Sequence, residues 1–385
     1  MNILYITNHL NIGGITSYVF TLASGLKRRG HNIYLASSAG ELLSKFLEQG
    51  IIYVPIPIKT KSEVSPKILV SIFKLSGLLK QNNIDIIHSH SRTTQVLGHL
   101  LSMNTGIAHI STCHGFFKKR FFRKIFPCWG SKVIAISESV KEHLTIDFGL
   151  QENQIVVIHN GIDTNKFREQ PALAKRSGPG RTENSPPWQS EAGQGEQRKK
   201  KLGLRGGLVV GIVARLSDVK GHIYLIEAMK VILEKMPDVQ LLIVGDGKMK
   251  EELLRLSKRL GIERNVFFVP SVSDTREVLS AMDLFVMPSL KEGLGLALME
   301  AMAYGLAVIG SDVGGITNLI KDNYNGVLVK PADSEAIADA ILGLLQDPQK
   351  REALGKQAQI FINQNFSQEK MCLETEREYL KCLPR

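Results

Sequence analysis

Short apolar runs recur along the first 170 residues of the chain, and longer segments of helical periodicity, such as 17–29 and 69–81, separate most of them. The runs lack a strict alternation of apolar and polar residues, as expected of strands that are covered on both faces. They span residues 2–7, 32–36, 51–54, 84–88, 108–113, 132–136 and 155–158. Alternation of strand and helix predicts a parallel, doubly wound sheet.

The same pattern begins again after residue 206. Further apolar runs are mostly separated by helical segments, and from about residue 333 the chain is predicted to be helical only. These runs span residues 208–214, 239–244, 266–269, 284–287, 307–310 and 326–329. We therefore predict two similar α/β domains. Because ligands of open parallel sheets bind at the carboxyl ends of the strands, the two domains are expected to face each other across a cleft that divides the reactants.

Composition sets the predicted domain boundaries. The first domain is expected over residues 1–170 and the second over 206–366. Between them, residues 171–205 are rich in Pro, Gly, Ser, Gln and charged residues and contain few aliphatic ones. Such a composition does not bury enough apolar surface to fold by itself, so we expect this segment to be a flexible insert beside the hinge.

Length and composition exclude several classes of protein. The chain has 385 residues, of which 43% are hydrophobic and 22% charged, as is ordinary for globular proteins. Its longest apolar runs fall far short of the roughly 20 residues that a membrane-spanning helix needs. Residues 1–7 are interpreted as a strand and not as a signal peptide. The four cysteines show no paired spacing, so we expect a soluble protein of a reducing compartment, without disulfides or a zinc site.

The charge is unevenly distributed. The net charge is +11, and residues 1–170 carry 19 Lys/Arg against 10 Asp/Glu, whereas residues 206–385 carry 21 against 24. A basic surface attracts nucleic acid, anionic lipid or phosphorylated substrates. Nucleic acid is not expected as a partner, because no helix-turn-helix, zinc finger or RNA-binding aromatic motif accompanies the charge.

The densest basic segment, 116–126, interleaves five basic residues with five phenylalanines. Such a segment can insert rings into a lipid interface while Lys and Arg contact anionic headgroups. The alternative is a core helix whose basic residues face water. The membrane contact is predicted at Phe117, Lys118, Lys119, Arg120, Phe121, Phe122, Arg123 and Lys124.

Two of the polar clusters that follow predicted strands could bind phosphate. Gly13 and Gly14 come soon after the first strand, where paired glycines permit a close backbone approach to a phosphate, although an ordinary turn explains them nearly as well. Arg215 and Lys220 lie at the first strand-to-helix turn of the second domain. Two such cations could clamp a diphosphate, and the alternative is a pair of solvated surface cations.

Two further clusters carry a carboxylate or an imidazole. Glu292 precedes a predicted helix that contains Glu300 among apolar residues, where a carboxylate needs partners such as sugar hydroxyls. The amides of Gly293, Leu294 and Gly295 at the start of that helix could bind phosphate oxygens. The alternative is a capping acid with a structural ion pair. His114 follows a predicted strand and could contact a reacting sugar, although a lone histidine is more often structural.

Metal chemistry is not expected. The pair His88 and His90 has a spacing that could bind a metal, but no third ligand follows at a suitable distance. The sequence also has no D-x-D pair. We therefore expect a departing diphosphate to be stabilised by Arg215, Lys220 and helix-start amides, with no metal and no other cofactor.

Taken together and in this order, the motifs resemble the retaining glycosyltransferases of family 4, also called group 1, which have the GT-B fold. The resemblance covers nearly the whole chain except 171–205, and it is strongest where Arg215 and Lys220 are followed by Glu292 and Glu300. Supporting motifs are Gly13-Gly14, Cys113-His114-Gly115, Ile136-Ser137-Glu138-Ser139, Val157–Asp163, Gly245-Asp246-Gly247 and Ser311–Gly315.

The resemblance implies a nucleotide diphosphate sugar as donor, bound by the second domain. It implies that Arg215 and Lys220 hold the diphosphate, that Glu292 contacts the donor sugar, and that Glu300 contacts the ribose. It also implies that Gly14 approaches the diphosphate from the first domain and that His114 contacts the transferring sugar. The final helix of such folds crosses back to the first domain, and the segment after about residue 367 is the candidate.

The expected activity is a metal-independent transfer of a hexose or N-acetylhexosamine with retention of anomeric configuration. The expected acceptor is a lipid-linked precursor of a surface polysaccharide or lipopolysaccharide, with the enzyme peripheral on the cytoplasmic face of the plasma membrane. No carboxylate is an evident covalent nucleophile, so a same-face mechanism is preferred. The alternatives are a GT-B sugar-nucleotide epimerase and a non-catalytic nucleotide-sugar-binding membrane scaffold. One departure is Thr317-Asn318, where family members often carry Pro-Glu.

Overall fold

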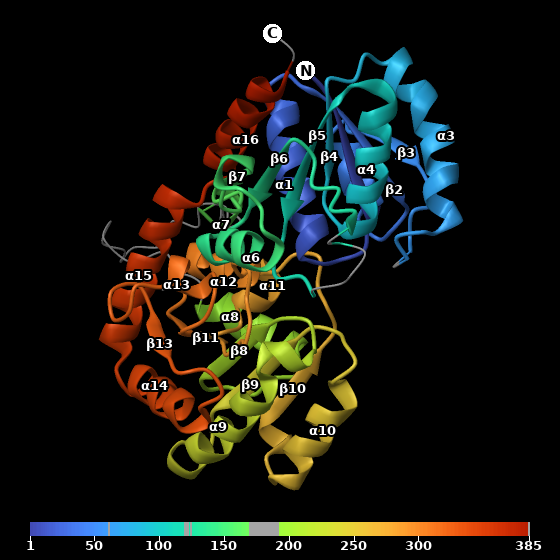
Figure 1. Cartoon of the computed structure of the whole chain (residues 1–385). Coiled ribbons are helices and arrows are strands. Elements are labelled where there is room, and N and C mark those ends of the chain that lie inside the picture. Colours follow the sequence, from blue (N-terminus) through green and yellow to red (C-terminus); the bar gives the residue numbers. More distant parts are fainter. Residues whose placement is uncertain (61, 119–122, 124, 169–191, 384–385) are drawn as a thin grey trace. The chain divides into compact units, whose positions relative to one another are not determined.

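The structure is a computed structural model that describes residues 1–60, 62–118, 123, 125–168 and 192–383. The chain divides into two units (Figure 1). The first unit contains Met1–Asp163 together with Phe366–Arg385, and the second contains Thr164–Asn365. Each unit is built on its own parallel sheet, so the predicted α/β class is confirmed.

The first unit has a seven-stranded sheet in the order β3-β2-β1-β4-β5-β6-β7. Every predicted apolar run of this half forms one of its strands; the inner strands are buried, as expected of a sheet covered on both faces, whereas the edge strand β3 is partly exposed. The strands are β1 (Asn2–His9), β2 (Asn32–Ser38), β3 (Ile52–Pro55), β4 (Ile86–Ser89), β5 (Ala108–Cys113), β6 (Lys132–Ala135) and β7 (Ile155–Val157).

Serine caps begin most of the long helices of the first unit. The side chains of Ser65, Ser91, Ser137 and Ser367 each accept a hydrogen bond from a backbone amide of the following first turn, which satisfies donors that have no partner inside the helix. The helices are α1 (Gly14–Arg28), α2 (Leu43–Glu48), α3 (Pro66–Gln81), α4 (Arg92–Thr105), α6 (Glu138–Phe148) and α16 (Gln368–Cys382), with a short 3-10 helix η1 (Glu152–Gln154).

The second unit has a six-stranded sheet in the order β10-β9-β8-β11-β12-β13. Its strands again match the predicted runs, and their side chains form one core with the helices α9 and α14. The strands are β8 (Val209–Val213), β9 (Gln240–Val244), β10 (Val266–Val269), β11 (Leu284–Met287), β12 (Val308–Ser311) and β13 (Val327–Val329).

The second unit also contains helices and short 3-10 turns, some before its first strand, some between strands and some after its last strand. The helices are α7 (Asn165–Arg168), α8 (Ala192–Lys201), α9 (His222–Lys235), α10 (Lys250–Arg259), α11 (Arg276–Leu279), α12 (Leu296–Tyr304), α13 (Ile316–Leu319), α14 (Ser334–Gln346) and α15 (Pro348–Asn365). The 3-10 turns are η3 (Asp218–Lys220) and η4 (Glu263–Asn265). No helix within the described residues combines the length and the apolar content that a membrane span requires.

The structure describes residues 192–205, the last part of the expected flexible insert. This part contains α8, and the Nζ atom of Lys199 lies 3.0 Å from the Oδ2 atom of Asp283. The amide of Arg205 donates to the side-chain oxygen of Gln240 at 2.7 Å. Local composition did not predict this structure, because its contacts are with Gln240 and Asp283, which lie far away in the sequence. Residues 169–191 lie outside the described part.

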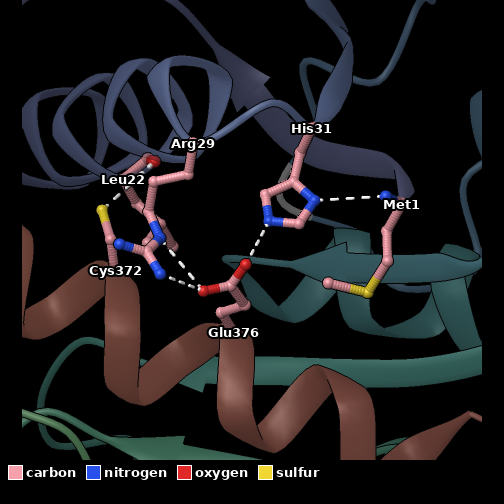
Figure 2. Close-up of polar contacts among 6 residues, drawn as sticks. All are labelled: Met1, Leu22, Arg29, His31, Cys372 and Glu376. Atoms are coloured by element: carbon pink, nitrogen blue, oxygen red, sulfur yellow. Dashed lines mark hydrogen bonds and ion pairs between the residues drawn. The ribbon is translucent and has the colours of Figure 1, made fainter.

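Helix α16 packs on the first unit and is held there by a polar cluster (Figure 2). The carboxylate of Glu376 pairs with Arg29 at 2.6 Å and with the Nε2 atom of His31 at 2.6 Å. The other ring nitrogen of His31 lies 3.2 Å from the amino group of Met1. One turn earlier, the thiol of Cys372 donates to the carbonyl oxygen of Leu22 at 3.7 Å. These contacts tie the end of the chain to α1 and to the start of β2.

Candidate functional site

Strands β8 and β11 are neighbours in the second sheet, so the segments that follow them lie at the same edge. Lys220 closes the turn η3 after β8, and Glu292 lies in the loop after β11. The Nζ atom of Lys220 forms an ion pair with the carboxylate of Glu292, and the two side chains are only 18% and 11% exposed. The hydroxyl of Ser289 donates to the same carboxylate oxygen at 3.3 Å. The structure thus brings together two residues that the sequence selected separately.

Close backbone contacts fix these loops against one another. Gly221 has φ +69°, and a Cβ atom added there would lie 1.8 Å from the carbonyl oxygen of Pro288. Gly315 donates its amide to the carbonyl of Glu292 at 3.0 Å, and a Cβ atom there would lie 2.0 Å from the carbonyl oxygen of Gly293. A larger residue at either glycine would force these loops apart.

The start of helix α12 presents backbone amides beside Glu292. Its N-cap residue is Gly295, with φ +98° and no side-chain cap. Gly293 and Gly295 are buried, and Leu294 is buried in the core. The amides of the first turn have no partner within the helix, and the helix dipole favours a negative group there. Amides at a helix start can bind phosphate oxygens; of the predicted residues, Gly295 is the N-cap of α12, whereas Gly293 and Leu294 precede the helix.

Arg215 follows the end of β8, and its environment differs from that of Lys220. Its side chain is exposed, and none of the described residues forms a hydrogen bond or an ion pair with it. The two cations of the predicted clamp are therefore unequal in this structure. Lys220 is paired with a carboxylate, whereas Arg215 has its charge available to an incoming anion.

Glu300 lies on α12, partly buried and close to α7 and α11. Burial raises the pKa of Glu300 from its ordinary value of 4.5 to about 7. A hydrogen bond with the side chain of Thr275 and the charge of Lys166 act in the opposite direction, and the charge of Asp274 raises the pKa further. This carboxyl group therefore changes its charge near neutral pH.

In the first unit, His114 follows β5 and is largely enclosed. Burial lowers the pKa of His114 to about 3, so its ring is neutral at physiological pH. The ring of Tyr18 packs edge-on against it, with the centroids 4.6 Å apart. Its Nε2 atom lies 3.3 Å from the Nδ1 atom of His90. His90 is also buried, and its pKa is lowered by burial first and then by His88 and His114.

The contact between the two histidines selects a tautomer. The Nε2 atom of His90 is buried and has no partner among the described residues, so a proton on it would be an orphaned donor, which is rarer than an under-used acceptor. His90 therefore carries its proton on Nδ1 and donates it to the Nε2 atom of His114. His114 then keeps its own proton on Nδ1, and this nitrogen has no hydrogen-bond partner within the described structure. The arrangement makes His114 a hydrogen-bond donor.

His88 has a structural role. Its Nδ1 atom lies 2.5 Å from the hydroxyl of Tyr379 on α16, and its Nε2 atom lies 2.7 Å from the hydroxyl of Thr112. Both ring nitrogens are occupied, so His88 is not placed to bind a metal with His90. Among the residues that the structure describes, no group of three or more His, Cys, Asp or Glu side chains is arranged for a metal ion.

Gly13 and Gly14 stand at the exposed start of α1. Gly13 is the N-cap residue, and no side chain caps the helix. The carbonyl of Gly13 accepts the amide of Ser17 at 3.0 Å, as in the first turn of a helix. The backbone amides of this turn are thus open, as the predicted approach to a phosphate requires.

The basic aromatic segment differs from expectation at Arg123. Arg123 is buried, and its guanidinium lies 3.9 Å from the centroid of the Phe117 ring, with Trp129 and Phe148 beyond it. Arg123 is therefore not placed to contact lipid headgroups, because the three rings hold it by cation–π contacts inside the first unit. Phe117 is half-buried, whereas Lys118 is exposed. The predicted contacts Lys119, Arg120, Phe121, Phe122 and Lys124 lie outside the described residues.

Sequence reasoning missed several polar residues at this site. Ser289 and Thr275 contact the two selected carboxylates. His90, which the sequence suggested only as half of a possible metal pair, contacts His114 in the first unit. His222 follows Gly221 directly and is buried, and neither ring nitrogen has a partner within the described residues. A polar residue within two positions of the end of a buried strand would have been a usable signal for Ser289 and for the contact made by His90.

Comparisons with known proteins agree with this architecture. The chain matches the model of group 1 glycosyl transferases over residues 194–361 and the model of glycosyltransferase family 4 over residues 12–166. It is 29% identical over 321 residues to UDP-Gal:alpha-D-GlcNAc-diphosphoundecaprenol alpha-1,3-galactosyltransferase of Escherichia coli, covering 79% of this chain and 78% of that protein. It is 27% identical to the capsular polysaccharide biosynthesis glycosyltransferase CapM of Staphylococcus aureus, covering 92% and 91%.

A solved structure extends the likeness to the whole fold. Anabaena HepE in complex with UDP-glucose superimposes with a TM-score of 0.83 at 22% identity, covering 99% of this chain and 100% of that one. The two family models together match most of the chain, one in each unit, and they leave out most of the expected insert. The chain therefore belongs to the group 1 glycosyltransferases of family 4, and it is a glycosyltransferase with the two-domain GT-B fold.

Proposed function

We propose that this enzyme transfers a hexose or N-acetylhexosamine from a nucleotide diphosphate sugar to a lipid-linked precursor of a surface polysaccharide or lipopolysaccharide. The observation that carries the donor is the pair of Lys220 and Glu292 beside the uncapped start of α12. The Escherichia coli relative is named for a UDP-galactose donor and a diphosphoundecaprenol-linked acceptor, and HepE was solved with UDP-glucose. Both names support the proposed substrate classes.

When the donor binds, its diphosphate would replace Glu292 as the ionic partner of Lys220. Lys220 and Glu292 neutralise one another before the donor binds, which keeps a largely buried cation and carboxylate in place. When a diphosphate enters, Lys220 can turn to its oxygens, with Arg215 and the amides of Gly293 and Leu294 as further donors. Glu292 then becomes available to accept hydrogen bonds from the hydroxyls of the donor sugar.

The proposed reaction retains anomeric configuration by a same-face route. The bond between the anomeric carbon and the departing phosphate oxygen breaks, the acceptor oxygen bonds to the same face of that carbon, and the departing phosphate takes the acceptor's proton. The Nδ1–H group of His114 would donate to an oxygen of the transferring sugar. Trapping a glycosyl-enzyme on Glu292 or on another carboxylate would contradict this route.

No metal ion is part of the proposed chemistry. Lys220, Arg215 and the first amides of α12 supply positive charge and hydrogen-bond donors where a leaving diphosphate needs them. Turnover should therefore persist in excess chelator. Loss of turnover with chelator and its return with magnesium or manganese would contradict the proposal.

One experiment tests the activity class. The purified enzyme would be incubated with a panel of UDP-, GDP- and ADP-sugars, with and without a prenyl-diphosphate-linked sugar as acceptor. We expect slow hydrolysis of one donor alone and faster transfer when the acceptor is present. Interconversion of the donor sugar without an acceptor would identify an epimerase instead, and binding without either reaction would identify a scaffold.

The proposed place of action is the cytoplasmic face of the plasma membrane, with the protein bound peripherally. The excess of Lys and Arg over Asp and Glu in residues 1–170 supports an anionic lipid surface as partner. The acceptor named for the Escherichia coli relative is itself lipid-linked. Binding to anionic vesicles that weakens with salt would support this location, and equal binding to neutral vesicles would count against it.

A further inference from the structure

Helix α3 of the first unit carries apolar side chains on two opposite faces. Ile68, Leu75 and Leu79 are buried in the core. On the opposite face, Leu69 and Phe73 are exposed, Phe73 to 82%. The outer face also contains Val70, and Val64 precedes the helix at 81% exposure. A helix that only closes a core needs one apolar stripe, so the outer stripe requires another explanation.

The outer stripe of α3 is flanked by positive charge alone. Lys67, Lys74 and Lys80 are exposed, and α3 contains no Asp or Glu. At about 100° per residue, Lys80 lies nearly in line with Phe73 two turns further along, and Lys67 and Lys74 lie on the side of Phe73 away from Leu69. The nearest preceding acid, Glu63, is neutralised by an ion pair with Arg92 at 2.8 Å. An anionic partner would therefore meet no opposing carboxylate on this helix.

Arg92 connects this face to the end of the basic aromatic segment. Besides Glu63, its guanidinium bonds the carbonyl oxygen of Phe126 at 2.6 Å and that of Pro127 at 2.5 Å. Ile125 and Phe126 are themselves exposed. The loop that leads into α3 and the end of the basic aromatic segment are thus held together. Figure 1 shows α3 at the outer edge of the first unit, beside α4.

We infer that the outer face of α3, with Val64, Ile125 and Phe126, is the surface by which the protein binds an anionic lipid bilayer. This inference rests on the proposed membrane association and names its contact surface. The apolar side chains would enter the interface between headgroups and acyl chains, while the lysines extend along it to meet phosphates. Within the described residues, α3 thus combines exposed apolar side chains, one of them the ring of Phe73, with exposed lysines.

Charge also favours a lipid surface over a second copy of this chain. A two-fold dimer places the same patch against itself, so the lysines beside Phe73 would approach their own copies. Like charges at close range are unfavourable, whereas anionic headgroups neutralise all of them at once. The same stripe therefore fits a bilayer better than it fits itself.

The test is sedimentation of the full-length protein with vesicles of phosphatidylcholine, with and without phosphatidylglycerol. We expect binding only to the anionic vesicles. Phe73→Ser should weaken it about tenfold or more, as expected from the loss of one buried aromatic side chain. The control is Tyr324→Ser, which removes an exposed aromatic residue from the second unit and should leave binding unchanged.

Charge variants test the second half of the inference. Replacing Lys67, Lys74 and Lys80 by Gln should weaken binding about fivefold for each lysine at low salt and should flatten its salt dependence. The matched control replaces Lys230, Lys235 and Lys258, which are exposed lysines of the second unit. Parental vesicle binding by both the Phe73 and the triple-lysine variants would overturn the inference, as would equal losses in the control triple.

Two further measurements separate this inference from its rivals. Donor hydrolysis should be unchanged in the α3 variants and lost in Lys220→Met, whereas Lys220→Met should still bind vesicles. If the parent protein shows no donor turnover at all, the proposed activity fails, but the vesicle-binding result still tests the proposed lipid surface. Circular dichroism and the melting temperature show whether the variants fold. If Phe73→Ser converts a dimer into a monomer in analytical ultracentrifugation and vesicle binding stays parental, the face is a dimer interface and the inference is wrong.

Discussion

At the scale of single residues, the chemistry depends on an ion pair that the donor must open. Lys220→Met removes the cation expected to stabilise the leaving diphosphate, and it also leaves Glu292 without its ionic partner. We expect transfer to fall by about 10²-fold or more, as when one preorganised donor is removed from an enzyme. The measurement is kcat with a saturating donor, with folding checked by circular dichroism.

A nearby lysine provides the control for this variant. Lys248 pairs with Asp218 at 3.6 Å, and both side chains are mostly exposed, so the pair contributes little. Lys248→Met should keep parental turnover. Equal activity of the two methionine variants would remove Lys220 from the mechanism.

The expected contact of Glu300 with the donor ribose predicts a pH dependence of donor affinity. Its pKa is raised to about 7, so the group is largely protonated at pH 5 and ionised at pH 8. The ionised carboxylate accepts hydrogen bonds from both ribose hydroxyls. The protonated carboxyl must lose its proton before it can do so, which weakens donor binding at low pH. Donor affinity should therefore rise by up to about tenfold per pH unit as pH increases toward 7, and then level off.

Titration calorimetry with the nucleoside diphosphate between pH 5 and 8 measures this dependence. Glu300→Gln should bind more weakly above pH 7 and should lose most of the slope. A slope that survives in Glu300→Gln belongs to another group. The linkage for folding has the opposite sign, because a carboxyl whose pKa is raised stabilises the fold at low pH and loses that contribution as pH rises from 4.5 to about 7.

The histidine pair predicts a graded response at His90. His90→Leu removes the donor to His114, so the ring of His114 is no longer held in one tautomer, and kcat should fall about tenfold or more while the KM for donor changes little. His90→Gln keeps an N–H donor and should retain more activity. The 15N spectrum of the ring nitrogens should show the proton of His114 on Nδ1 in the parent only. The same spectrum in His90→Leu would contradict the assignment.

At the scale of elements, burial explains why the strands were predictable. The inner strands of both sheets, such as β1, β4, β9 and β11, are buried along most of their length, so local apolar content alone identified them. The serine caps similarly mark the starts of α3, α4, α6 and α16. Helix α8 could not be predicted this way, because its order depends on Lys199 meeting Asp283, which lies far away in the sequence.

The ion pair between Lys220 and Glu292 could not be predicted from the local sequence pattern either. It requires β8 to lie beside β11, although β9 and β10 intervene along the chain. Periodicity locates strands but does not give their order in a sheet. The residues of the site were therefore predictable one by one from their places after strands, and their mutual contacts were not.

The attachment of α16 gives a prediction at this scale. Burial alone would raise the pKa of Glu376, but Arg29 and His31 lower it overall and bond its carboxylate (Figure 2). Glu376→Gln should reduce stability by about 1 kcal/mol or less, because the site is partly solvated. A depressed carboxyl pKa stabilises the fold above pH 4.5 and loses that contribution as pH falls. The difference in melting temperature between the parent protein and Glu376→Gln should therefore shrink as pH falls below 4.5. The control Glu374→Gln, on the same helix, should have the melting temperature of the parent at every pH.

At the scale of the whole molecule, two sheets with separate cores mean that a ligand need not stabilise the entire chain equally. The residues proposed to hold the donor diphosphate come mainly from the second unit. A ligand that binds only the folded form of one unit lowers the fraction of that unit that is open. At a ligand concentration of one hundred times the Kd, this fraction falls about a hundredfold. Local opening can be followed strand by strand through hydrogen exchange.

With saturating UDP, amides of β8 and β11 should therefore exchange about a hundredfold more slowly, while amides of β1 and β4, at the centre of the first sheet, should change far less. Lys220→Met should abolish most of the difference, because the slowing depends on the diphosphate contact. Equal protection of both sheets would mean that the two units open as one, and stronger protection of β1 and β4 would place the nucleotide in the first unit. Stronger protection of β8 and β11, lost in Lys220→Met, would support a donor bound by Lys220 at the carboxyl end of the second sheet, whereas stronger protection of β1 and β4 would contradict it.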